Sequence, residues 1–262
     1  MQTKNILRAV KNSFSSAYFL RIYCNYFLRH YLFSFSYKDY RFLRGRETLD
    51  RLETKRKSFI RLGDGEIAIL YGFDVHFQRY SDDLRRALLK ILSEYGPASP
   101  YLLGVPVDFI ERLARDRHSQ DETLRCFRLS EAFLRDRLKK DNVYGDSLLF
   151  WDNFQKDWSF FKPLWEGKAV VMIGSMSKYF QNNDLPGASR NFIVEAPEKD
   201  AFEKLGSIEN NVKELADSKK LEKDKTVILV SLGPAAKPLA YNLSKKGWIV
   251  YDTGHFFSKK LN

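Results

Sequence analysis

Four short apolar runs in the second half of the chain place the tightest limits on its fold. They are Lys168–Ile173, Asn191–Glu195, Thr226–Ser231 and Trp248–Asp252. Their residues lack the polar alternation of a strand with one face in water, so we predict strands that are buried on both faces. Helices are predicted between them, at Ala201–Leu215 and Ala235–Lys245. A repeated strand–helix–strand order is typical of a parallel sheet covered by helices, that is, of an α/β, Rossmann-like fold.

The first half of the chain extends this pattern. The predicted elements are strands at Phe59–Leu62 and Tyr101–Val105, a helix at Asp82–Glu94, helical segments at residues 108–140 and 150–165, and a strand end or turn at residues 142–147. We therefore expect a single Rossmann-like domain with a mostly parallel central sheet at residues 47–262. A basic, aromatic helical arm is expected at residues 1–46.

A glycine-rich acidic loop follows the first predicted strand. Gly63 and Gly65 flank Asp64, and Glu66 comes two residues after it. Two carboxylates at this spacing can both reach one hard divalent cation, and the glycines let a phosphate approach the backbone. The alternative is an ordinary strand-to-helix turn, in which Asp64 caps the helix and Glu66 lies in its first turn.

Three further predicted strands also end in small or acidic residues. Ser175 follows one strand, Gly233 follows the next, and Asp252 and His255 follow the last. Ligands of open parallel sheets bind beyond the carboxyl ends of the strands. The joint placement of these residues at one sheet edge favours a binding site over four unrelated turns.

The usual signals of several enzyme classes are absent from the sequence. It has no GxGxxG dinucleotide loop, no GxxxxGK[ST] phosphate loop, no HExxH or clustered Cys/His for zinc and no GxSxG elbow. An acidic loop on a Rossmann-like sheet suits a diphosphate leaving group, whose developing charge a divalent cation held by Asp64 and Glu66 could neutralise.

An ordered set of short motifs resembles the GT-D-type glycosyltransferases over residues 55–255. The motifs are RLGDGE at 61–66, YGDS at 144–147, LW at 164–165, ND at 183–184, LGPAAKPLAYNLSKKG at 232–247 and DTGH at 252–255. The resemblance implies transfer of a sugar from a nucleotide donor, typically a UDP-sugar, with Mn²⁺ or a similar ion such as Mg²⁺. It places the DxE motif of the family on Asp64 and Glu66. It also implies a role similar to that of enzymes that build bacterial surface glycans.

This resemblance lets roles be assigned to the candidate residues. Asp64 and Glu66 would bind the metal and the diphosphate, and Asp252 or His255 would act as the base that deprotonates the acceptor, although a lone histidine at a strand end is often structural. The residues assigned to donor binding are Arg61, Gly63, Gly65, Asp146, Ser175, Asp184, Gly233 and Pro234. For Arg61 a structural ion pair is an equal alternative, and for Ser175, Gly233 and Pro234 the alternative is turn geometry.

The positive charge of the chain is concentrated at its N-terminus. Residues 1–46 hold nine Lys or Arg and one acid, out of a net charge of +11 for the whole chain. Nucleic-acid binding is therefore not expected, since it would need basic residues across the folded body. Basic and aromatic residues together fit a helix lying on an anionic membrane surface. The alternative is an arm packed on the body or on a second subunit, as in a homo-oligomer.

The remaining expectations concern location and partners. Cys24 and Cys126 lack metal-type spacing and no cleavable leader is visible, so we expect a cytoplasmic protein, peripheral at the inner face of the plasma membrane. The expected partners are a nucleotide-sugar donor and a glycan or lipid-linked glycan acceptor. Two alternative functions are a Rossmann-like methyltransferase binding S-adenosylmethionine and a non-catalytic nucleotide-binding adaptor.

Overall fold

The structure, a computed structural model, describes residues 37–116, 122–150, 158–175, 185–254 and 256. The chain divides into two compact units, and one of them holds residues 38–107 and 139–262. The other is described through residues 37, 108–116 and 122–138. Most of the predicted arm, together with Asp184 and His255, lies outside the described residues.

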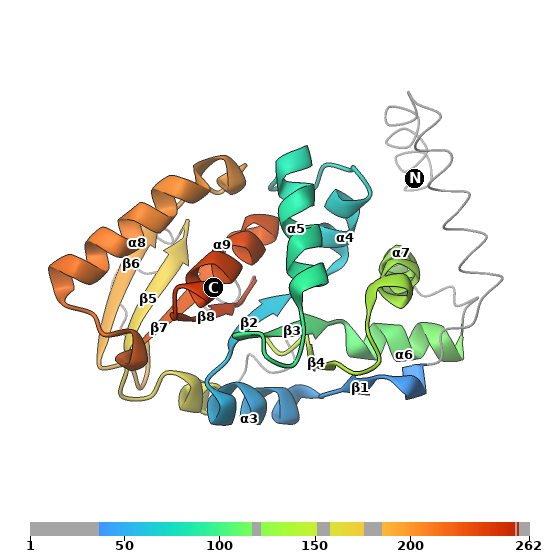
Figure 1. Cartoon of the computed structure of the whole chain (residues 1–262), viewed down its shortest axis with the longest axis horizontal. Coiled ribbons are helices and arrows are strands. Elements are labelled where there is room, and N and C mark those ends of the chain that lie inside the picture. The colour runs from blue at the N-terminus through green and yellow to red at the C-terminus, as the bar shows by residue number, and fades with distance from the viewer. Residues whose placement is uncertain (1–36, 117–121, 151–157, 176–184, 255, 257–262) are drawn as a thin grey trace. The chain divides into compact units, whose positions relative to one another are not determined.

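The larger unit is built on one sheet of eight strands in the described part of the chain (Figure 1). The strands are β1 (Arg41–Phe42), β2 (Ser58–Arg61), β3 (Tyr101–Val105), β4 (Val143–Asp146), β5 (Ala169–Gly174), β6 (Arg190–Glu195), β7 (Thr226–Ser231) and β8 (Ile249–Asp252). Their order is β1-β4-β3-β2-β8-β7-β5-β6, and every pairing is parallel. The predicted α/β fold with a parallel sheet is confirmed.

Helices cover both faces of this sheet (Figure 1). One face carries α4 (Asp64–Leu70), α5 (Asp82–Glu94), α8 (Leu205–Lys219) and α9 (Ala236–Lys245), and the other carries α3 (Gly45–Lys55). The 3₁₀ turns are η1 (Tyr37–Asp39), η3 (Trp158–Phe160), η4 (Lys162–Leu164), η6 (Ala201–Lys204), η7 (Lys223–Lys225) and η8 (Gly233–Ala235). Among the described residues, no helix has both the length and the apolar character needed to cross a bilayer.

The smaller unit contains two helices in its described part. They are α6, which spans Val107–Arg115 and whose first residue is assigned to the larger unit, and α7, which spans Glu122–Arg137. The rings of Phe109 and Phe127 stack with their centroids 3.9 Å apart, so an aromatic pair joins the two helices. The sequence predicted residues 108–140 to be helical, and the structure divides this segment into two elements.

An aromatic core lies on the α3 face of the sheet. Leu49 and Leu52 of α3 pack into it beside Phe59 of β2 and Tyr251 of β8. The other large aromatic side chains of this core are Phe150, Phe161, Trp165 and Phe256. Because α3 and β1 both belong to the larger unit, the folded body begins before residue 46, where the sequence placed the end of the arm.

The segment predicted as one helix at residues 150–165 has a different structure. Its described part forms the 3₁₀ turns η3 and η4. Pro163 lies in η4 and lacks the amide hydrogen that an α-helix would need there. The turns direct Phe161, Leu164 and Trp165 into the core, where each is completely buried. Core packing therefore overrides the helical interpretation of this aromatic run.

Candidate functional site

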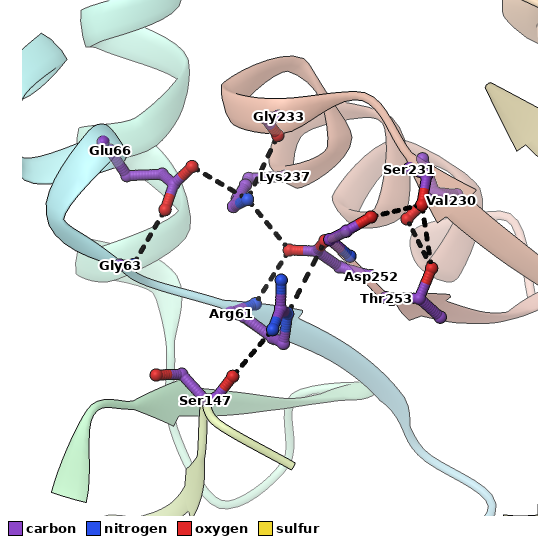
Figure 2. Close-up of polar contacts among 12 residues, drawn as sticks. Arg61, Gly63, Glu66, Ser147, Val230, Ser231, Gly233, Lys237, Asp252 and Thr253 are labelled. Carbon is purple, nitrogen blue, oxygen red and sulfur yellow. Dashed lines mark hydrogen bonds and ion pairs between the residues drawn. The ribbon is translucent and has the colours of Figure 1, made fainter. Parts of the chain in front are cut away.

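The candidate site forms where strands from distant parts of the sequence meet. β2 and β8 are neighbours in the sheet, with Phe59 in register with Tyr251. Their carboxyl ends bring the RLGDGE motif and residues 252–254 together, and β7 adds Ser231 and the turn that opens α9 (Figure 2). The predicted convergence of these strand ends at one edge is thus present among the described residues.

The acidic loop turns directly from β2 into α4. Gly63 precedes the helix, and its backbone N–H donates a hydrogen bond of 2.7 Å to Oε2 of Glu66. Glu66 is 6% exposed, so this carboxylate is an internal cap of the turn. Asp64 is exposed, and its Oδ1 accepts a hydrogen bond of 2.9 Å from the N–H of Gly65. The local structure agrees with the helix-turn alternative, with the capping contact made by Glu66 rather than Asp64.

A buried lysine connects this loop to the end of β8. Nζ of Lys237, on α9, lies 2.8 Å from Oε1 of Glu66 and 3.0 Å from Oδ2 of Asp252 (Figure 2). It also donates a hydrogen bond of 3.1 Å to the carbonyl oxygen of Gly233. Burial by itself lowers the pKa of Lys237, but the carboxylates of Asp252 and Glu66 more than offset this effect and raise the pKa above its ordinary value. The two carboxylates therefore favour the charged ammonium form of Lys237.

Arg61 supplies a second cation at the same strand end. Its backbone N–H donates to Oδ2 of Asp252 at 3.3 Å, and its Nη1 donates to the carbonyl oxygen of Ser147 at 2.8 Å. Its Nε is buried, forms no hydrogen bond with the described residues and lies 3.7 Å from Oδ1 of Asp252. Arg61 is thus paired with a structural acid, one of its two predicted alternatives. Its role toward a phosphate stays a prediction.

The environment of Asp252 does not suit a general base. Its side chain is 0% exposed, and its Oδ1 accepts a hydrogen bond of 3.2 Å from the N–H of Gly254. Its Oδ2 faces Lys237 and the N–H of Arg61. A base must reach the proton that it removes, whereas this carboxylate is enclosed by cations and backbone donors. His255, the other predicted base, lies outside the described residues.

The other predicted residues lie at the ends of their strands as expected. Gly233 is partly buried and Pro234 is buried at the start of η8, and Ser175 is partly buried after β5. Asp146 ends β4, where its Oδ1 accepts a hydrogen bond of 2.9 Å from the N–H of Leu148. This contact stabilises the turn after β4. Donor binding by these residues stays a prediction.

The sequence did not assign a role to Lys237. Its neighbours in the sequence are all apolar: Ala235, Ala236, Pro238 and Leu239. Ala235, Ala236 and Leu239 are buried. A lysine inside such a run is unusual, since lysine is almost never fully buried unless it is paired. That position was the available signal, but the sequence could not show which acids would face the ammonium.

Comparison with known proteins gives the family of the chain. Residues 59–259 match the family described as glycosyltransferase GT-D fold. The chain belongs to this family. The match covers the candidate site and the strands β2 to β8, except for Ser58, the first residue of β2. The glycosyltransferase resemblance predicted from the ordered motifs is confirmed.

Two streptococcal proteins are similar to this GT-D member over most of its length. Glycosyltransferase GlyD of Streptococcus pneumoniae serotype 4 is 26% identical over 230 residues, and a probable glycosyl transferase Gly of Streptococcus gordonii is 28% identical over 224 residues. Each similarity covers 81% of the chain but only 26% and 31% of the two relatives. The chain therefore spans less than a third of the length of either.

Solved structures share the fold. A structure described as a highly conserved domain of unknown function with a distinct glycosyltransferase fold has a TM-score of 0.70 and 25% identity, with 89% of this chain and 83% of that chain covered. A structure described as a new glycosyltransferase from Streptococcus sanguinis has a TM-score of 0.67 and 24% identity, with coverage of 84% and 83%. The second likeness supports the fold alone.

The carboxylates of the site differ in their suitability for a divalent cation. No cluster of three or more His, Cys, Asp or Glu able to hold a metal occurs among the described residues. Mg²⁺-like ions are commonly held by one or two carboxylates together with substrate phosphates, so one accessible carboxylate is enough. Asp64 is exposed and fits this requirement, whereas both oxygens of Glu66 are already in contact with other groups.

Proposed function

We propose that this GT-D chain transfers a sugar from a nucleotide-sugar donor, specifically a UDP-sugar, to a glycan acceptor with the help of Mn²⁺ or Mg²⁺. Family membership supports sugar transfer over the methyltransferase and adaptor alternatives. The metal and the nucleotide donor in this proposal are supported by a difference in exposure among the carboxylates of the site. Asp64 is exposed at the end of β2, while Glu66 and Asp252 are buried beside cations.

The described residues would have different roles toward the bound donor. Asp64 would hold the divalent cation, which when bound supplies positive charge against the departing diphosphate. Arg61 and Lys237 pair with Asp252 and Glu66 beneath the same strand ends and fix the positions of these charges around the loop. A preorganised charge distribution of this kind favours the transition state because it needs no rearrangement as negative charge develops.

The proposal predicts that Asp64→Asn removes metal-dependent binding of the donor. Asn keeps the size of the side chain but loses the charge that attracts a hard cation. Calorimetry with UDP and a panel of UDP-sugars, with and without Mn²⁺, is the measurement. We expect wild type to bind UDP more tightly in Mn²⁺, and Asp64→Asn to bind equally in both buffers. We also expect sugar transfer to fall by about 10²–10³-fold, as after loss of an oxyanion-hole donor.

Asp217→Asn is the matched control, since Asp217 is exposed on α8 and outside the site. It should bind as wild type does. Metal-independent UDP binding by wild type, or full metal dependence in Asp64→Asn, would contradict the role assigned to Asp64. A thermal shift with S-adenosylmethionine and none with UDP plus Mn²⁺ would overturn the proposed donor.

We further propose that the acceptor is a lipid-linked or protein-linked surface glycan and that residues 1–46 bring the enzyme to anionic membrane at the cytoplasmic face. The support is the basic and aromatic composition of that segment.

Deletion of residues 1–36 is expected to abolish sedimentation with vesicles of anionic lipid. This boundary keeps β1 and the ion pair of 2.8 Å between Asp39 and Lys140, so the sheet stays intact. Wild type should bind anionic vesicles and not neutral ones, since the attraction is electrostatic. The binding should be seen at low salt, because salt screens such attraction. Equal sedimentation of the truncated and full-length chains would refute membrane binding by this segment.

A further inference from the structure

The ammonium of Lys237 is fully used inside the protein. Its three acceptors are Oε1 of Glu66 at 2.8 Å, Oδ2 of Asp252 at 3.0 Å and the carbonyl oxygen of Gly233 at 3.1 Å (Figure 2). A lysine ammonium has three N–H donors. With three acceptors around a side chain that is 4% exposed, no donor is left to bind a substrate directly. Lys237 therefore acts on the site through the groups that it holds.

The first of these groups is Glu66, whose two oxygens have different partners. Oε2 accepts from the N–H of Gly63, and Oε1 faces Lys237. A divalent cation bound at Oε1 would lie beside the ammonium and be repelled by it. Moving Lys237 aside would instead deprive a buried cation of one of its two carboxylate partners, which is unfavourable. Glu66 is thus held as an internal clamp of the loop.

The charges of this buried cluster balance one another. The buried group contains two cations, Arg61 and Lys237, and two carboxylates, Glu66 and Asp252. Buried charges persist when they are paired and hydrogen-bonded, and these four form a connected, neutral set. Asp64 is outside the set: it is exposed and forms no ion pair with the described residues.

We propose that Lys237 is a positioning residue that keeps Glu66 buried and bonded within the loop. As a result, Asp64 alone of the two GDGE carboxylates contacts the divalent cation. This inference rests on the proposed metal-dependent transfer and refines it. Lys237 ties Glu66 and Gly233 to β8 and thereby holds the GDGE turn next to the turn that opens α9. In this arrangement the carboxylate of Asp64 stays at the surface while its companion is inside.

A charge-balanced double variant separates this arrangement from a two-carboxylate metal site. Glu66→Gln with Lys237→Met removes one charge of each sign, so the cluster stays neutral, and the amide oxygen of the new side chain still accepts from the N–H of Gly63. Mn²⁺ affinity is measured by calorimetry in the presence of UDP, and folding by circular dichroism. We expect the double variant to bind Mn²⁺ within about threefold of wild type, because the net charge near Asp64 is unchanged, and Asp64→Asn to lose about tenfold or more, because it removes the anionic ligand.

The single variant Lys237→Met tests the positioning role. It releases Glu66 and leaves one uncompensated negative charge near Asp64, so we expect Mn²⁺ to bind about three- to tenfold more tightly, because cation affinity rises with ligand charge. A purely structural lysine would lower the melting temperature and leave the Mn²⁺ affinity of the folded protein unchanged. If the single variant fails to fold, the double variant still decides between the two arrangements.

The outcomes separate the inference from the proposed function. Loss of Mn²⁺ affinity in the double variant to the same extent as in Asp64→Asn would show Glu66 to be a direct ligand and overturn the inference, while metal-dependent transfer would stand. Unchanged affinity in folded Lys237→Met would overturn the positioning role. Absence of Mn²⁺ binding by wild type would overturn both.

Discussion

Replacing Asp252 by asparagine is expected to lower the free energy of unfolding by about 3–5 kcal/mol, the usual cost of removing one partner from a buried charge pair. Asp252 is 0% exposed and lies beside two cations, Arg61 and Lys237. After the substitution only Glu66 would balance them, so the cluster would hold a net positive charge in a medium that solvates it poorly. The asparagine amide would also place a donor toward groups that are themselves donors.

Urea unfolding followed by circular dichroism measures this effect. Asp83→Asn is the control, because Asp83 pairs with Arg86 on the exposed face of α5 with 77% of its side chain accessible, and exposed pairs contribute little. Adding Lys237→Met to Asp252→Asn restores neutrality, since Glu66 then balances Arg61, and should recover part of the loss. Equal stability of Asp252→Asn and Asp83→Asn would contradict the view that this cluster stabilises the sheet edge.

Much of the fold could be predicted because its strands carry a simple physical signal. β3, β7 and α5 have the bounds predicted for them, since apolar strands buried on both faces and a one-sided apolar helix leave clear patterns. The meeting of the GDGE and DTGH turns also followed from the rule that strand ends of a parallel sheet share an edge.

The sequence could not show which side chains of the site pair with one another. The spacing of Asp64 and Glu66 was compatible with both a metal site and a helix turn, and only tertiary contacts separate the two carboxylates. Glu66 is buried and paired with Lys237, which lies 171 positions later in the sequence. The partners of Lys237 depend on the register of β2 beside β8. Local patterns carry no information on such contacts, and for the same reason the aromatic run at residues 150–165 was predicted to be helical.

Gly254→Ala is expected to displace Arg61 and to destabilise the protein by about 2.5–5 kcal/mol. Gly254 has φ of +57°, a left-handed conformation that costs other residues about 1–2 kcal/mol. A Cβ at this position would lie 1.8 Å from Nη2 and 2.9 Å from Cζ of Arg61. The guanidinium would have to leave, and its charged hydrogen bond to the carbonyl of Ser147 would be lost, at about 1.5–3 kcal/mol.

Two comparisons isolate these contributions in the same unfolding assay. Gly167→Ala introduces a Cβ at φ of +71° with no atom within 4 Å, so it should show the backbone cost alone. In an Arg61→Met background, Gly254→Ala should likewise cost little more than Gly167→Ala, because the hydrogen bond to Ser147 is already gone and the flexible methionine can yield to the new methyl group. If Gly254→Ala in the wild-type background matched Gly167→Ala, Arg61 would be free to move without loss. The larger cost expected here means that the glycine of the DTGH turn is required by the guanidinium packed against it, so that the two motifs constrain each other across the sheet.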